Sequence, residues 1–309
     1  MPRRRLPPWL PFAAAGLLAA GCGGPAGTDG NLVNNWPTQA AASYSPPAAG
    51  TCLGGVAFSA FEPPGTGTPD VVDCAALHTV EVVGVGTFSG AIAAATAPPA
   101  WDSDGTRAAY ADCDRAATTY AGADWHTGRL FPFLSVPREP AWQGGARQFV
   151  CGLAEAADDL FAPLTRTGSV RGGLADPRPL ALTCVLLDGT DVSPQGFYGS
   201  VDAVTPIDCS RPHDTEFVGV WVAPAGPYPD AQRLGELAGD ACFNEIAAFL
   251  GLSKLQLYQR GDVYTFWNGL TAAQWKLGDR TAHCFLNVAS TTLLQGTLKG
   301  LGTKPLPTS

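Results

Sequence analysis

The stretch Phe266–Cys284, FWNGLTAAQWKLGDRTAHC, holds five residues in a spacing that occurs twice in the chain. The spacing is F-x8-W-x2-G-x-R-x3-C. Its residues are Phe266, Trp275, Gly278, Arg280 and Cys284 in the later copy, and Phe133, Trp142, Gly145, Arg147 and Cys151 in the earlier copy. Five identical residues at unchanged spacing predict that the chain contains one folding unit written twice.

The cysteines follow the same duplication. Each predicted repeat has four of them, and the distance from first to last is 99 residues in one repeat and 100 in the other. They are Cys52, Cys74, Cys113 and Cys151, then Cys184, Cys209, Cys242 and Cys284. We therefore expect one domain over residues 51–155 and a second over 179–294, with a linker at 156–178 and a frayed polar tail at 295–309.

Two further blocks recur inside each repeat. The first is C-x3-H-x2-E-x2-G, followed by β-branched and aromatic residues that predict a strand. It contains His78 and Glu81 in repeat one and His213 and Glu216 in repeat two. The second block is C-x6-[YF]-x-G, with apolar residues at helical spacing and a glycine, Gly122 or Gly251, where a helix ends.

Strand and helix patterns are segregated in each repeat rather than regularly alternating, which favours an α+β fold. We expect two tandem, homologous, disulfide-stapled domains. Each would be a small antiparallel sheet packed with one main helix.

The N-terminus has the pattern of a lipoprotein signal. Arg3, Arg4 and Arg5 precede an apolar run, and small residues close it before Cys22. We expect a signal peptide over 1–21, a lipid on Cys22 and a flexible tether over 22–50, rich in Gly, Pro and Ala. The alternative is a retained membrane anchor, but the apolar run is short and contains Pro11.

Charge narrows the possible partners. Removal of the segment before Cys22 leaves 16 Lys and Arg against 27 Asp and Glu, a net charge of about −11. Nucleic-acid binding needs clustered basic residues, so we exclude it. No later segment has 18 unbroken apolar residues, so we expect the rest of the chain to lie outside the cytoplasm without crossing the membrane.

Nine cysteines leave eight once Cys22 carries the lipid, an even number that predicts four disulfides in an oxidising compartment. Four cysteines allow three pairings per repeat. We favour second with third and first with fourth, which would pin the helix to the strand entry and close the domain ends. The predicted bonds are Cys74–Cys113, Cys52–Cys151, Cys209–Cys242 and Cys184–Cys284.

The later repeat resembles a known family. The residues CSRPHDTEFVG at 209–219, the helical Cys242 and WKLGDRTAHC at 275–284 are similar to the septum-formation domain of actinobacterial lipoproteins and membrane proteins. The earlier repeat departs from this pattern at Ala76-Leu77 and at Ala146. The resemblance implies an exported, anchored module with a role in cell division and no established catalysis.

The His–Glu pairs offer the strongest candidate chemistry. His78 with Glu81, or His213 with Glu216, could act as an acid–base pair, or could bind a metal with Asp73 or Asp208 as a third ligand. The structural alternative is a histidine that caps the turn by bonding a backbone carbonyl or its own glutamate. We favour the structural alternative and expect no metal and no cofactor.

Other framework residues have a structural interpretation as well. We expect Arg147 and Arg280 to pair with carboxylates such as Glu81 and Glu216, and Trp142 and Trp275 to lie in the core. The alternatives are an anion ligand for the arginines and a stacked sugar for the tryptophans. His126 and His283 occur in one repeat each and are given no role.

These patterns predict an extracytoplasmic lipoprotein without enzymatic activity, held to the membrane by the lipid on Cys22. It would serve as a binding or scaffold module linked to septum formation, with an envelope or cell-division protein or a cell-wall glycan as partner. The alternatives are an envelope enzyme that uses His213 and Glu216, and a glycan or small-molecule binder in the cleft between the repeats.

Overall fold

The computed structural model describes residues 45–65, 69–157 and 162–308, and residues 43–309 form one compact unit. The predicted signal peptide (1–21), the lipidation site Cys22 and most of the predicted tether (22–50) lie outside the described residues. We call the described chain up to residue 178 the N-terminal half, and the chain from residue 179 the C-terminal half.

The N-terminal half contains one antiparallel sheet in the order β2-β1-β3-β5-β4, with β6 paired to β5 outside this path. Its strands are β1 (Cys52–Gly54), β2 (Asp70–Val72), β3 (Val80–Thr87), β4 (Leu130–Ser135), β5 (Gln148–Ala156) and β6 (Pro163–Leu164). Every residue of β5 after Gln148 is buried, which requires cover on both faces of the sheet. A helix covers one face, and Phe58 packs on Phe131 and Phe133 at the other, with ring centroids 5.4 and 5.2 Å apart.

The C-terminal half contains a second antiparallel sheet, in the order β8-β7-β9-β11-β10. Its strands are β7 (Cys184–Thr190), β8 (Ser200–Ile207), β9 (Thr215–Val222), β10 (Tyr264–Gly269) and β11 (Thr281–Asn287). Counted within each half, this is the strand order of the N-terminal sheet. The register also agrees, because Phe133 and Phe266 each lie opposite the residue that follows the last cysteine of their half.

Six α-helices occur in the described residues, together with one 3-10 turn, η1 (Trp125–Thr127). They are α1 (Gly90–Ala94), α2 (Asp104–Ala121), α3 (Glu139–Gln143), α4 (Ala231–Leu250), α5 (Lys254–Arg260) and α6 (Ala272–Leu277). The two long helices begin at side-chain caps, Ser103 and Asp230, and end at glycines with φ of 88° at Gly122 and 74° at Gly251. The predicted helix ends are therefore confirmed.

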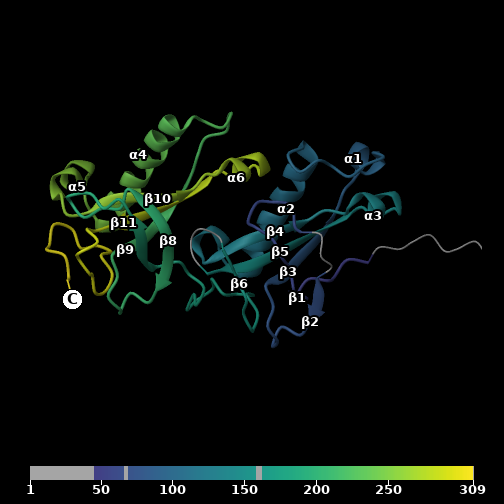
Figure 1. The fold of residues 1–309 in the computed structure, drawn as a ribbon, viewed down its shortest axis with the longest axis horizontal. Coiled ribbons are helices and arrows are strands. Elements are labelled where there is room, and N and C mark those ends of the chain that lie inside the picture. Colours follow the sequence, from purple (N-terminus) through teal and green to yellow (C-terminus); the bar gives the residue numbers. More distant parts are fainter. Residues whose placement is uncertain (1–44, 66–68, 158–161, 309) are drawn as a thin grey trace, which may run out of the picture. The chain divides into compact units, whose positions relative to one another are not determined.

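Each sheet carries one long helix, as Figure 1 shows: α2 packs on β3 and β5, and α4 packs on β9, β10 and β11. The mixed α and β composition and the two antiparallel sheets are confirmed. That the halves are homologous domains stays a prediction. Within the residues described, none of the helices combines the length and the apolar character that a membrane crossing requires.

All eight cysteines after Cys22 form disulfides, as predicted, but the predicted pairing is wrong. The expected bonds Cys74–Cys113, Cys52–Cys151, Cys209–Cys242 and Cys184–Cys284 are all absent from the described structure. The observed bonds join first to second and third to fourth in each half: Cys52–Cys74, Cys113–Cys151, Cys184–Cys209 and Cys242–Cys284.

Sheet geometry explains the observed pairing. Cys52 on β1 lies opposite Val72 on β2, so the chain brings Cys74 beside it, with 5.2 Å between Cα atoms. The helical Cys113 instead lies over β5, where Cys151 is 5.0 Å away. A disulfide needs Cα atoms within about 7 Å. The helical cysteine therefore bonds Cys151 on β5 and not Cys74 in the turn before β3.

A glycine makes room for each helix-to-sheet disulfide. Gly84 lies opposite Cys151 in the sheet, and Gly219 lies opposite Cys284. A Cβ on Gly84 would come within 3.3 Å of Ala116 on the helix, which is a crowded contact. In the N-terminal half, the glycine that ends the C-x3-H-x2-E-x2-G block therefore lets the helix approach the sheet, whereas a Cβ on Gly219 would meet only a side-chain oxygen of Glu245 at 3.4 Å.

The predicted linker and tail are both part of the fold. The linker segment 166–170 pairs with the His78 turn through two backbone hydrogen bonds between His78 and Arg166, each 2.9 Å. At the end of repeat two, Leu294 makes the equivalent bonds to His213, and in the tail Leu298 is fully buried. The expectation of a frayed tail over 295–309 is wrong for its described residues, because apolar side chains and backbone bonds fix it to the C-terminal half.

Replacing both Cys242 and Cys284 by alanine should lower the free energy of unfolding by about 4 kcal/mol, because the bond closes a loop of 42 residues. Guanidinium unfolding followed by tryptophan fluorescence measures this change. Non-reducing peptide mapping of the same variant should still find the Cys184–Cys209 peptide. A wild-type peptide that joins Cys184 to Cys284 would contradict the observed pairing.

Candidate functional site

The first candidate site is the buried carboxylate of Glu81 on β3. Its side chain accepts hydrogen bonds from the Ser169 hydroxyl and the Val170 amide, both at 2.7 Å, and from the Tyr120 hydroxyl. Glu81 is only 2% exposed. A buried carboxylate is stable only where donors replace water, and here three donors do so. Glu81 thus holds the segment that leaves the N-terminal half.

Glu216 on β9 holds the tail in the same way. It accepts from the Leu298 amide at 2.7 Å and from the Thr297 hydroxyl. Burial raises the pKa of Glu216, and the bonds from Thr297 and Leu298 act against this rise. We call each glutamate with the segment it binds, residues 168–170 or 296–298, a closing clasp.

The histidines of both blocks cap the turn before the strand. Nδ1 of His78 lies 2.9 Å from the Ala76 carbonyl oxygen, and Nδ1 of His213 lies 2.8 Å from that of Arg211. Both side chains are buried, at 1% and 0% exposure. The predicted structural role, a turn-capping histidine bonded to a backbone carbonyl, is confirmed in both halves.

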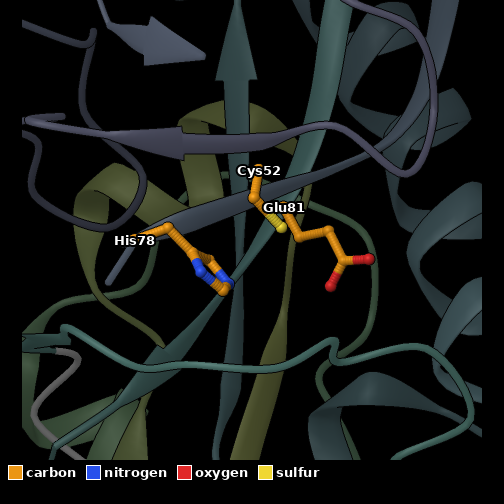
Figure 2. A group of neighbouring side chains, drawn as sticks. All are labelled: Cys52, His78 and Glu81. Atoms are coloured by element: carbon orange, nitrogen blue, oxygen red, sulfur yellow. The ribbon is translucent and has the colours of Figure 1, made fainter. Parts of the chain in front are cut away.

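Neither His–Glu block has the donor set of a metal site. Figure 2 shows the His78 imidazole and the Glu81 carboxylate on either side of the Cys52 sulfur, and the ligand atoms of these three residues lie within 4.8 Å of one another. That sulfur is bonded to Cys74, so it is not a thiolate. The proposed third ligands point elsewhere, because Asp73 and Asp208 are exposed and accept backbone amides of their own turns at 2.8 Å.

The predicted ion pairs between blocks are wrong. Arg147 does not bond Glu81; it donates to the carbonyl oxygens of Ala93 at 2.6 Å and Trp142 at 2.7 Å, and its guanidinium lies 4.0 Å over the Trp142 ring. Arg280 donates from Nε to the Ala223 carbonyl oxygen at 3.1 Å, and not to Glu216. Both glutamates are already occupied by the closing clasps, which sequence spacing did not reveal.

The two framework tryptophans differ. Trp142 is 1% exposed and donates to the Ala95 carbonyl oxygen, so its predicted core position is confirmed. The predicted core position of Trp275 is wrong: its side chain is only partly buried at the edge of a core cluster and meets the exposed Tyr228 edge-on at 5.6 Å. Trp267 packs in the same cluster as Trp275, whereas Phe266 packs in a different one.

The second candidate site lies where the two halves meet, and it involves residues to which the sequence pattern assigned no role. Nδ1 of His126 bonds the Asp124 carboxylate at 2.7 Å, and Nε2 lies 3.5 Å from the Asp279 carboxylate of the C-terminal half. The Tyr110 hydroxyl donates to Asp279 at 3.2 Å, and the Thr281 amide donates to it at 2.9 Å. The side chains of His126 and Asp279 are 13% and 2% exposed.

This arrangement fixes two charges. Burial by itself lowers the pKa of His126, but the bonds to Asp124 and Asp279 outweigh it and raise the pKa to about 9. Burial likewise raises the pKa of Asp279, but His126 and the Thr281 amide outweigh it and hold the pKa below its ordinary value. Since a general base must be neutral near its working pH, His126 is suited to joining the halves and not to taking up protons.

The sequence contains a signal for the closing clasps, but the repeat pattern contains none for the junction residues. The segments that complete the clasps read GSVRG at 168–172 and GTLKG at 296–300, a fourth repeated block. The second glycine of each also bonds the aromatic residue of the helix block, Gly172 to Tyr120 and Gly300 to Phe249, through backbone atoms at 2.9 Å. His126 and Asp279 have no counterpart in the other repeat, so a search for repeated residues passed over them.

Fold and site together define a disulfide-stapled α+β protein of an oxidising compartment outside the cytoplasm, because four structural disulfides do not persist in a reducing one. The sequence model of the septum-formation family matches residues 49–284, and the chain belongs to that family. The match is continuous across both halves. Its description connects the chain with cell division. No curated relative and no solved structure matches the chain.

Replacing Glu216 by leucine should release the tail, because the Leu298 amide and the Thr297 hydroxyl lose their acceptor. Hydrogen exchange should accelerate at residues 294–300 while the amides of α4 stay protected. We expect the free energy of unfolding to fall by about 1–3 kcal/mol. Unchanged exchange in the tail would show that its apolar contacts suffice without the clasp.

Stability should depend on His126 between pH 6.5 and 9. Its folded pKa of about 9 lies above its ordinary value of 6.5, so its contribution is complete below pH 6.5 and is lost as pH rises through 9. The loss is on the order of 3 kcal/mol. Urea unfolding at pH 6 and pH 9.5 measures it.

In a His126→Gln variant the difference between the two pH values should shrink by that amount. His283→Gln is the matched control, because it removes a buried histidine that lies away from the junction. An equal pH response in wild type and His126→Gln would exclude His126 as its source.

Proposed function

We propose that this protein is a lipid-anchored, extracytoplasmic scaffold or binding module, without enzymatic activity, that acts in septum formation. The observation that carries the proposal is that the His–Glu blocks of both halves, and Trp142 with Arg147 in the N-terminal half, are occupied in holding the fold. His213 caps a turn, Glu216 binds the tail, and Trp142 with Arg147 packs inside the N-terminal half. What recurs in both halves is thus an architecture and not a reaction centre.

The alternative of an envelope enzyme that uses His213 and Glu216 has less support. Both side chains are almost fully buried, and Glu216 is occupied by donors from the tail. A catalytic pair needs a reactive atom open to substrate, and neither residue offers one in this arrangement. A cell-wall glycan as ligand has one favourable observation, the partly exposed pair of Trp275 and Tyr228, whose rings would suit sugar stacking.

The proposal includes a duplication. Strand order, disulfide pattern, turn-capping histidine and closing clasp agree between the halves, which supports an origin as two tandem copies of one unit. We further propose the anchor as the sequence predicts it, with cleavage after residue 21 and a lipid on Cys22, as in the actinobacterial lipoproteins that the sequence resembles. Envelope or division proteins are the proposed partners. Nucleic acid is not among them, because the chain is acidic.

Cys22→Ser should abolish lipid attachment while the disulfide-stapled part still folds. Metabolic labelling with an alkyne fatty acid should mark the wild-type chain and leave the variant unmarked. After cell fractionation, the wild-type chain should be found with the membrane and the variant in the medium. A labelled Cys22→Ser chain would sink the lipoprotein assignment.

The division role is tested by depletion of the protein in its own host. We expect delayed or misplaced septa, restored by the wild-type chain and by a variant with Glu245→Gln, a polar residue outside the clasps. Restoration by a Trp142→Ala chain that no longer folds would contradict a scaffold role. Cell-wall hydrolysis by the purified chain, lost in His213→Ala, would favour the enzyme instead.

A further inference from the structure

A cavity of about 540 Å³, open on one side to solvent, lies at the junction of the halves. One wall is a stripe of α2, a second is the segment around His126, and the third is the turn from α6 into β11. Its lining residues with acidic or basic side chains are Arg107, Asp114, Asp124, His126, Asp279 and Arg280. The volume lies in the range that small-ligand sites occupy.

Arg280 lines this cavity and has unused donors. Its Nε bonds the Ala223 carbonyl oxygen, and among the described residues its two terminal nitrogens have no partner. Arg147, its counterpart in the other half, bonds through both Nε and Nη1 and is stacked on Trp142. In the N-terminal half the framework arginine, Arg147, thus uses its donors within the fold. In the C-terminal half its counterpart Arg280 keeps one edge of the guanidinium group without a partner among the described residues. Such an edge matches the two oxygens of a carboxylate.

Acceptors lie in the same cavity. Asp114 uses Oδ1 to accept the Trp125 indole N–H at 2.7 Å, and Asp124 uses Oδ1 for His126. The second oxygen of each carboxylate has no partner in the described part of the chain. Unlike Asp279, which is buried, Asp114 is partly exposed and Asp124 is exposed. These oxygens are suited to an ammonium or another N–H donor on a ligand.

The balance of charge selects the ligand class. A phosphate would meet three carboxylates, those of Asp114, Asp124 and Asp279, so a multiply charged anion is disfavoured. A simple cation would meet the guanidinium groups of Arg107 and Arg280. A molecule with a carboxylate at one end and an amine at the other satisfies both sets of groups.

We propose that the cavity between the halves binds a free amino acid or short peptide, with the ligand carboxylate on Arg280 and its ammonium group on Asp114 and Asp124. The ion pair between His126 and Asp279 and the hydrogen bond from Tyr110 to Asp279 join the two walls, so the site exists only when the halves are joined. This site does not depend on the scaffold role, and either proposal can fail without the other.

Isothermal titration of the detergent-solubilised full chain with alanyl-alanine, in its L,L and D,D forms, tests the proposal. At least one form should bind. The same dipeptide with an acetylated amine and an amidated carboxyl should not, because both charged ends are masked. Inorganic phosphate should not compete. Failure of both free dipeptides to bind, or equal binding of the blocked one, would overturn the assignment.

Variants locate the site. Arg280→Gln should weaken binding at least tenfold, and Asp114→Asn should do the same while keeping an acceptor for the Trp125 indole. Arg233→Gln, which removes an exposed arginine on α4, is the matched control and should bind as wild type does. Circular dichroism shows whether each variant folds; should Arg280→Gln fail to fold, Asp114→Asn decides. Undiminished binding in a folded Arg280→Gln or Asp114→Asn chain would place the peptide elsewhere.

Discussion

The structure depends on a buried carboxylate that binds the chain as it leaves each half. Glu81 and Glu216 lie on the third strand of each half, opposite the cysteine of the first strand. Each accepts hydrogen bonds from an amide and a hydroxyl of a segment far along the chain. The cost of burying such a charge is high unless donors surround it. A segment that supplies them is therefore fixed in position, and residues that look like a linker and a tail become part of the core.

The clasps also account for the recurrence of the His–Glu block in both halves without a catalytic role. The histidine caps a turn, the turn aligns the glutamate, and the glutamate holds the closing segment. The disulfide beside each block joins the first strand to that same turn. The second disulfide of each half fixes the long helix to the sheet, over a glycine that permits close approach. In each half, one disulfide thus attaches the turn to the sheet, and the other attaches the long helix to it.

Function is more readily sought where the halves differ. Asp279 stands in the position of Ala146, and its pairing with His126 has no equivalent on the other side of the molecule. Two unlike sets of residues come together there, one from each half, and they border the cavity that Arg280 lines. Under the proposed duplication, the shared framework keeps the fold while the junction between the copies is free to vary.

The sequence by itself determined the parts whose physics is local. Helical spacing ending in Gly122 and Gly251, strands after the His turns, the even number of cysteines and the acidic charge can all be read from neighbouring residues. It also contained GSVRG and GTLKG, a repeat that would have pointed to the clasps. The tertiary structure alone decided which cysteines pair, which donors reach Glu81 and Glu216, and that His126 meets Asp279. Those outcomes depend on spatial distances between segments that lie about 20 to 150 residues apart in the sequence. Sheet order and helix placement set these distances, and linear spacing does not.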